Sequence, residues 1–133
     1  MPVQRPIPLW TRGCPGSAGA NSATGTERVL RRVARMADGG FPSAGLQDGV
    51  EDVIARLHEY FRRESRDPSE VGIEGSVSLA DRGLESWIKQ ALAWKEAGAT
   101  HLTVNTAGAG FTALDQHVAA MKLFQHAWSD VEL

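Results

Sequence analysis

Residues 84–110 read LESWIKQALAWKEAGATHLTVNTAGAG, and this stretch decides the fold class. Its first half carries apolar side chains at helical spacing and ends at Gly98, a residue that readily takes the left-handed conformation that closes a helix. Residues 101–106 are rich in β-branched side chains, which predicts a strand, and glycines follow at 108 and 110. The stretch therefore encodes a helix, a tight turn and a buried strand in direct succession.

The same succession extends outward in both directions. Thr24 to Glu27 has the spacing of a capping box and starts a helix that Asp38-Gly39-Gly40 ends, and Asp48 opens another helix that stops before Pro68. The last helix carries an apolar stripe that we expect to face the core, formed by Leu114, Val118, Met121, Phe124 and Trp128. Strands are expected at 7–11 and 71–77, and residues 41–42 leave room only for a very short strand or an extended turn. Residues 12–25, which are rich in glycine and serine, are expected to form a flexible loop.

Strands that alternate with helices predict an α/β fold with a parallel sheet. Periodicity alone does not distinguish an open doubly wound sheet from part of a (β/α)₈ barrel. In either arrangement Leu9, Ile73, Leu102 and Val104 are expected to be buried between the sheet and its helices.

The composition favours a single domain in a reducing, cytoplasmic setting. The chain has 133 residues, a formal net charge of -2 and one cysteine, Cys14. These totals give no reason to expect a nucleic-acid partner, and no apolar run is long enough to span a membrane. Four arginines at 28, 31, 32 and 35 are interpreted as a solvated helix face.

Three segments in register resemble the luciferase-like monooxygenase family, especially its members that use the deazaflavin F420. They are residues 5–10 (RPIPLW), 32–42 (RVARMADGGFP) and 97–104 (AGATHLTV). The resemblance covers residues 6–128 and implies the last four βα units of a TIM barrel. A whole barrel needs about 250 residues, so 133 residues supply about half of it.

The resemblance further implies an oxidoreductase that binds F420 or FMN and a small organic substrate, and that catalyses hydride transfer or monooxygenation. Because the first strands of the family barrel carry much of the ring pocket, we expect this chain to be inactive alone. The expected protein partner is a second copy of the chain or a missing N-terminal half.

The cofactor is expected at the loops that follow strands, where backbone amides can approach a phosphate. The candidate cofactor-binding residues are Thr11, Arg12, Gly13, Gly39, Gly40 and Phe41. We expect Arg12, Gly13, Gly39 and Gly40 to share one rim of the sheet with Gly108. The chain departs from the family at two of these positions, with Arg12 in place of a glycine and Gly40 in place of a tryptophan. The alternative explanation of the glycines, that they simply make turns, stays open.

No catalytic residue and no metal ligand are assigned from the sequence. His58 is interpreted as a surface residue and His101 as a side chain that fills one end of a barrel. His117 and Asp115 are two residues apart and do not face each other on a helix, and His117 and His126 are too far apart to share a metal. A second hypothesis from a different class remains, namely a non-catalytic α/β module that associates with another chain through an exposed sheet edge.

Overall fold

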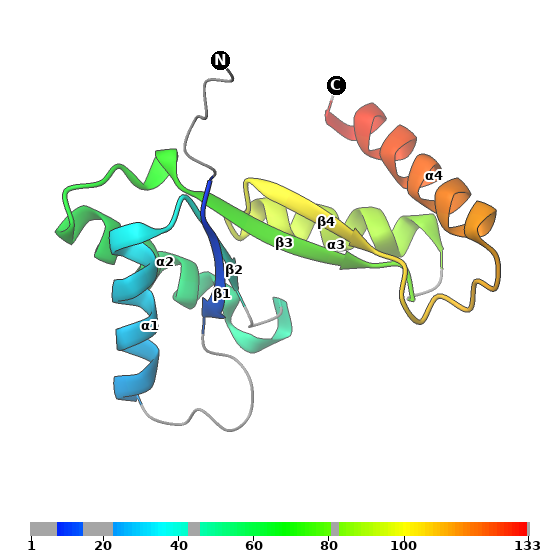
Figure 1. The fold of residues 1–133 in the computed structure, drawn as a ribbon. Helices are drawn as coiled ribbons and strands as arrows, with labels where there is room; N and C mark the ends of the chain where they lie inside the picture. The colour runs from blue at the N-terminus through cyan, green and yellow to red at the C-terminus, as the bar shows by residue number, and fades with distance from the viewer. Residues whose placement is uncertain (1–7, 15–22, 43–45, 81–82, 133) are drawn as a thin grey trace, which may run out of the picture.

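The computed structural model describes residues 8–14, 23–42, 46–80 and 83–132. Strands and helices alternate along the chain (Figure 1). The elements are β1 (Trp10–Cys14), α1 (Ala23–Met36), β2 (Gly39–Pro42), the 3-10 turn η1 (Leu46–Asp48), α2 (Val50–Arg63), the 3-10 turn η2 (Pro68–Glu70), β3 (Gly72–Ser78), α3 (Leu84–Glu96), β4 (His101–Asn105) and α4 (Leu114–Glu132).

The four strands form one parallel sheet in the order β1-β2-β3-β4, which confirms the predicted α/β class. In β1 and β2, Trp10 pairs with Gly39 and Thr11 with Gly40, and in β3 and β4, Glu74 pairs with His101. Each strand therefore lies beside the strand that follows it in sequence. Right-handed connections between such neighbours place the connecting helices on one face of the sheet.

β3 is the long central strand, and it joins two halves of the molecule. Its pairing with β2 is limited to Gly39↔Gly72 and Gly40↔Ile73, whereas its remaining length pairs with β4. Beyond β2, side chains of α3 take over as hydrogen-bond partners of β3. The Trp94 indole donates to the Ser76 carbonyl at 2.9 Å, and Gln90 bonds both the N–H and the carbonyl of Ser78 at 3.1 and 3.2 Å.

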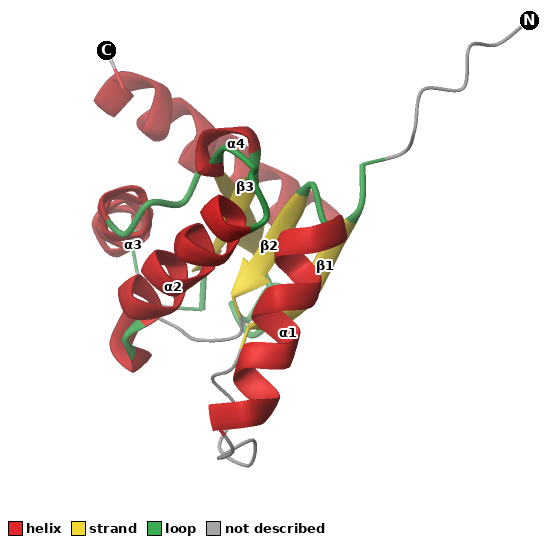
Figure 2. Ribbon diagram, turned by 90° about the vertical axis from the view of Figure 1, so that its left-hand side faces the viewer, coloured by secondary structure: helices red, strands yellow, loops and turns green. Residues whose placement is uncertain are grey.

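The core lies between the sheet and the helices that cover it. α1 and α2 lie side by side against one face of the sheet, as the view along the sheet shows (Figure 2). Gly40 faces Val33 of α1 and Leu57 of α2, and Gly75 faces the Trp94 ring of α3. The largest fully buried side chains are Phe61, Leu30, Leu57, Ile73, Val33, Val50, Val71 and Val77.

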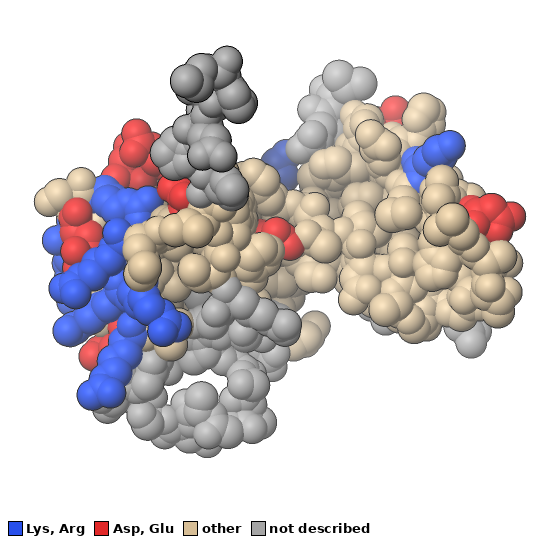
Figure 3. All heavy atoms as spheres, viewed as in Figure 1, with Lys and Arg blue, Asp and Glu red and all other residues tan. Residues whose placement is uncertain are grey.

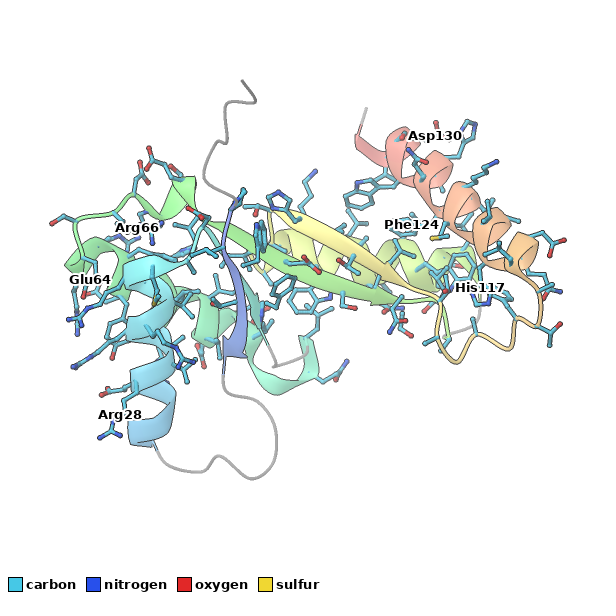
Figure 4. All side chains as sticks on the ribbon, viewed as in Figure 1. Arg28, Glu64, Arg66, His117, Phe124 and Asp130 are labelled. Carbon is cyan, nitrogen blue, oxygen red and sulfur yellow. The ribbon has the colours of Figure 1, made fainter. Side chains whose placement is uncertain are left out.

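Polar contacts join the ends of α1 and α2. Arg66 donates to the Ala34 carbonyl at 2.8 Å and lies over the Phe61 ring, and Arg35 pairs with Glu64 at 3.1 Å. Figure 4 shows Arg66 and Glu64 where the end of α2 approaches α1. The four arginines of α1 that were predicted to form a solvated face are all exposed, namely Arg28, Arg31, Arg32 and Arg35. None of the helices in the described ranges combines the length and apolarity needed to cross a membrane.

The N-terminal strand begins later than the sequence predicts. We expected a strand at 7–11, but β1 spans Trp10–Cys14, and residue 7 lies outside the described part of the chain. Leu9, predicted to be buried, is 54% exposed. Pro8 has no N–H to donate, and the Leu9 N–H bonds the Asp38 carboxylate at 2.8 Å, so strand pairing starts at Trp10.

The predicted loop over 12–25 is also wrong at both ends. Arg12 to Cys14 belong to β1, and α1 starts at Ala23, one residue before the predicted capping box. Strand pairing with β2 orders the first of these segments despite Gly13. The middle of the predicted loop, residues 15–22, lies outside the described ranges.

The apolar stripe predicted for the last helix is only partly covered. Phe124 is buried, but Leu114 is 79% exposed and Met121 is 40% exposed. The reason is topological, since β4 is an edge strand and no further strand lies beside it in the described residues. Leu102 and Val104 of β4 are half-buried for the same reason, whereas Ile73 is buried as predicted.

Candidate functional site

One face of the sheet is not covered by the connecting helices, and side chains of chemical interest gather there. Residues along β3 alternate between the two faces, with Ile73 and Val77 buried toward the helices and Glu74 and Ser76 on the opposite face. In β4 the residues paired with Glu74 and Ser76 are His101 and Thr103. This second surface is called the open face below.

An aromatic cluster lies on the open face at the N-terminal ends of the strands. The Trp10 indole lies over the backbone of Gly39 and Gly72, because an added Cβ on either glycine would approach its ring atoms to 2.5 and 2.4 Å. The Trp10 ring centroid lies 5.4 Å from that of Phe41 and 4.9 Å from that of His101, which it meets edge-on. The absence of a side chain at Gly39 and Gly72 therefore makes room for the Trp10 ring, which explains why glycine occupies both positions.

A polar group continues from this cluster along β3 and β4. The Thr103 hydroxyl donates to the Glu74 carboxylate. The Nδ1 atom of His101 lies 2.8 Å from the Thr100 hydroxyl, which also accepts a hydrogen bond from the Ile73 N–H. These contacts hold Glu74 and His101 in neighbouring positions with acceptor and donor groups on one surface.

A shallow pocket lies in the gap where β2 and β3 separate, between the open face and Trp94 of α3. It has a volume of about 390 Å³ and is lined by Phe41, Pro42, Glu74, Ser76 and Trp94. The walls combine two aromatic rings with one carboxylate. Such a lining suits a flat ring that carries hydrogen-bond donors.

The structure brings the six predicted cofactor-binding residues together on two paired strands. Thr11 is the register partner of Gly40 and Arg12 is that of Phe41, while Gly13 and Gly39 lie next to them in β1 and β2. They do not all face the same way. Phe41 contacts Trp10 on the open face, whereas Gly40 faces the helices. The Thr11 hydroxyl is buried and has no hydrogen-bond partner among the described residues.

The predicted common rim is wrong for two glycines. We expected Gly39 and Gly40 to follow a strand, but they form the first half of β2. Gly13 and Phe41 lie toward the C-terminal ends of β1 and β2, and Gly108 follows β4 with a φ of 77°. Only residues 37 and 38 lie between the end of α1 at Met36 and the start of β2 at Gly39. Both glycines therefore belong to the strand and not to the turn before it.

Sequence reasoning missed the open face itself. Trp10, Glu74 and Thr103 are not among the predicted site residues, and His101 is predicted to fill one end of a barrel. The available signal is the alternation in β4 and in residues 74–78 of β3, where every second residue is polar or titratable. Only the register reveals that Glu74 and His101 are neighbours.

Three other titratable side chains, His58, Asp67 and His117, lie away from the open face or are held by a neighbouring residue. Burial, reinforced by the nearby Arg62 guanidinium, lowers the pKa of His58. Hydrogen bonds from Ser69 lower the pKa of Asp67. The Nδ1 atom of His117 lies 2.8 Å from the Thr106 hydroxyl, so this histidine is oriented by the residue after β4. Across the described ranges, no group of three or more His, Cys, Asp or Glu could hold a metal ion.

A second concavity lies on the helix side, beside β4. It has a volume of about 520 Å³, and its lining is mostly apolar. Its apolar walls are Ala99, Leu102, Val104, Met121, Phe124 and Trp128, and we call it the β4 groove. Because it faces away from the aromatic cluster, it is a separate feature of the molecule.

Comparisons of the chain with models of known protein families, with curated proteins and with solved structures returned no match.

Proposed function

We propose that this chain is the cofactor-holding C-terminal half of a luciferase-like (β/α)₈ oxidoreductase, and that it binds F420 or FMN on the paired strands β1 and β2. The observation that carries the proposal is the register of these two strands. It brings Thr11, Arg12, Gly13, Gly39, Gly40 and Phe41 together on two paired strands, with Phe41 packed against the Trp10 ring. The resemblance in sequence drew attention to the same residues independently of their pairing.

The sheet geometry supports the barrel part of the proposal. Four parallel strands in sequential order, with their helices on one face, have the arrangement of four successive units of a (β/α)₈ barrel. In such a barrel the open face lines the interior. The polar side chains on it, Glu74, Ser76, His101 and Thr103, would then face the enclosed space rather than water.

The chemistry of the patch suits the two ends of a flavin-type cofactor. Trp10 and Phe41 offer aromatic surface for a ring, and the positive charge of Arg12 suits a phosphate. F420 and FMN supply the hydride chemistry when bound, and this chain's residues supply position and electrostatics. Glu74 and His101 lie beside the aromatic end, where they can accept and donate hydrogen bonds to a bound ring.

The test is a fluorescence and absorbance titration of the purified chain with FMN and, separately, with F420. We expect saturable binding of one of them, weakened by Arg12→Ala roughly 10- to 100-fold, as is typical for loss of a hydrogen bond to a charged group. Arg28→Ala is the matched control, since it removes the same charge from the exposed surface of α1. No binding of either cofactor, or equal weakening by both variants, would contradict the proposal.

We also expect no measurable turnover by the chain alone, even with cofactor bound. Hydride transfer needs a ring held within about 3 to 3.5 Å of the reacting carbon, and a misplacement of about 1 Å costs about a hundredfold. The described strands would contact the cofactor on one side only and leave its other side open to water. Reduction of an acceptor at about 1 s⁻¹, an ordinary enzyme rate, would show that these residues contain a complete site.

A further inference from the structure

Both edges of the sheet end in uncovered apolar surface. In the described part of the chain, β1 and β4 each have a neighbouring strand on one side only. The β4 groove exposes part of the apolar side of α4, with Met121, which is 40% exposed, on its wall. Phe124, which Figure 4 shows pointing from α4 toward the sheet, stacks with Trp128 at a centroid distance of 6.4 Å.

Two exposed apolar side chains lie near the β1 edge. Leu9 precedes β1 and Met36 ends α1, and the two are 54% and 57% exposed. They lie at one junction, because the Leu9 carbonyl accepts a hydrogen bond from the Asp38 N–H at 2.8 Å. This junction is at the N-terminal end of β1.

The two apolar surfaces occupy corresponding ends of their strands. Ala99 and Leu102 place the β4 groove at the N-terminal end of β4, where Trp128 near the end of α4 closes it. A strand that pairs in parallel with β4 brings its own N-terminal end to this place. Parallel pairing of β1 with β4 would therefore bring Leu9 and Met36 to the groove.

The helices beside the two edges have opposite charge. α1 contains four arginines and one glutamate, and α4 contains two aspartates, one glutamate and one lysine. Figure 3 shows the basic side chains gathered on the side of the molecule that α1 occupies, away from α4. In a ring of alternating strands and helices, α4 of one sheet lies next to α1 of the sheet that follows it. Opposite charge at that contact favours encounter and the correct orientation.

We propose that the β4 groove is the docking site for β1 and α1 of a second copy of this chain. The reciprocal contact, between β1 of the first copy and β4 of the second, is the same interface and closes a two-fold symmetric ring of eight parallel strands. The ring leaves no sheet edge free and places both open faces inside it. This inference rests on the partial-barrel part of the proposed function and is independent of the cofactor.

The experiment measures the molar mass of the whole 133-residue chain by light scattering and sedimentation over a wide range of protein concentration. We expect a dimer of twice the 14.3 kDa chain mass that dissociates on dilution. Met121→Glu in the β4 groove and Met36→Glu at the β1 edge should each raise the dissociation constant about tenfold or more, because a charge is then buried in an apolar contact. The matched control is Leu123→Glu, since Leu123 is on α4, is 50% exposed and does not line the groove.

Each remaining outcome overturns a stated part of the inference. A monomer at all concentrations overturns the docking of a second copy, and a series of growing oligomers overturns the closed ring. Equal loss of dimer in Leu123→Glu overturns the role of the groove. A dimer that survives both methionine variants overturns edge-to-edge pairing. Circular dichroism of each variant checks folding, and the two edges give independent variants if one does not fold.

The test separates failure of this inference from failure of the proposed function. A dimer that binds neither FMN nor F420 supports the ring and contradicts the cofactor. A monomer that binds either cofactor supports the cofactor and contradicts the ring.

Discussion

Two adjacent glycines of β2, Gly39 and Gly40, should respond in opposite ways to the same substitution. At Gly39 an added Cβ would lie 2.5 Å from Cδ2 and Cε3 of Trp10. Because carbon atoms pack at about 3.5 to 4.0 Å, the indole would have to retreat by about 1 Å. It has little room to do so, since it also covers Gly72 and packs against Phe41 and His101.

We therefore expect Gly39→Ala to lower the free energy of unfolding by about 1–3 kcal/mol, the usual cost of overpacking. At Gly40 the nearest atoms to an added Cβ are those of Leu57 and Val33 at 3.8 Å, which is ordinary contact. Gly40→Ala should then raise stability by about 0.4–1 kcal/mol, because alanine restricts the unfolded chain.

The assay is urea unfolding followed by far-UV circular dichroism. With a slope of about 2 kcal/mol per molar urea, a gap of about 2 kcal/mol separates the midpoints of the two variants by about 1 M. Coincident midpoints, or a more stable Gly39→Ala, would refute the packing of Trp10 described above. If Gly39→Ala lowers stability but leaves cofactor affinity unchanged, Gly39 has a role in packing only.

Three further predictions concern single side chains. Trp94→Phe should lower the free energy of unfolding by about 1–3 kcal/mol in the same urea assay, because the Ser76 carbonyl loses the indole N–H; unchanged stability would mean that this hydrogen bond is dispensable. Thr11→Val should raise stability by about 1 kcal/mol, since the buried hydroxyl has no partner among the described residues; a loss of stability would reveal a partner. His58→Gln should reduce the loss of stability on acidification. The native pKa of His58 is lowered, first by burial and then by Arg62, so protonation favours the unfolded chain as the pH falls below about 6.5; melting curves of both proteins at pH 8 and pH 5 test this, and identical pH dependence would argue against it.

Much of the fold could be predicted from local sequence. Residues 84–110 contain a helix, a left-handed glycine and a strand, and the structure has α3, Gly98 with a φ of 101° and β4 in these places. Parallel pairing also followed from the alternation of elements, because a helix between two strands leaves them pointing the same way. The beginning of β1 did not follow, since apolar residues 7–9 resemble a strand whether or not a neighbour is in register with them.

The candidate site was likewise predictable only in part from the sequence. The sequence placed Thr11 to Gly13 and Gly39 to Phe41 in one site by resemblance, yet it gave no means of telling which of them share a face. Register decided this, because it set Trp10 against Gly39 and Glu74 against His101, residues that are 29 and 27 positions apart. The sequence likewise determined the apolar stripe of α4. Whether that stripe is buried depends on a neighbour for β4, which is a property of the sheet and not of the helix.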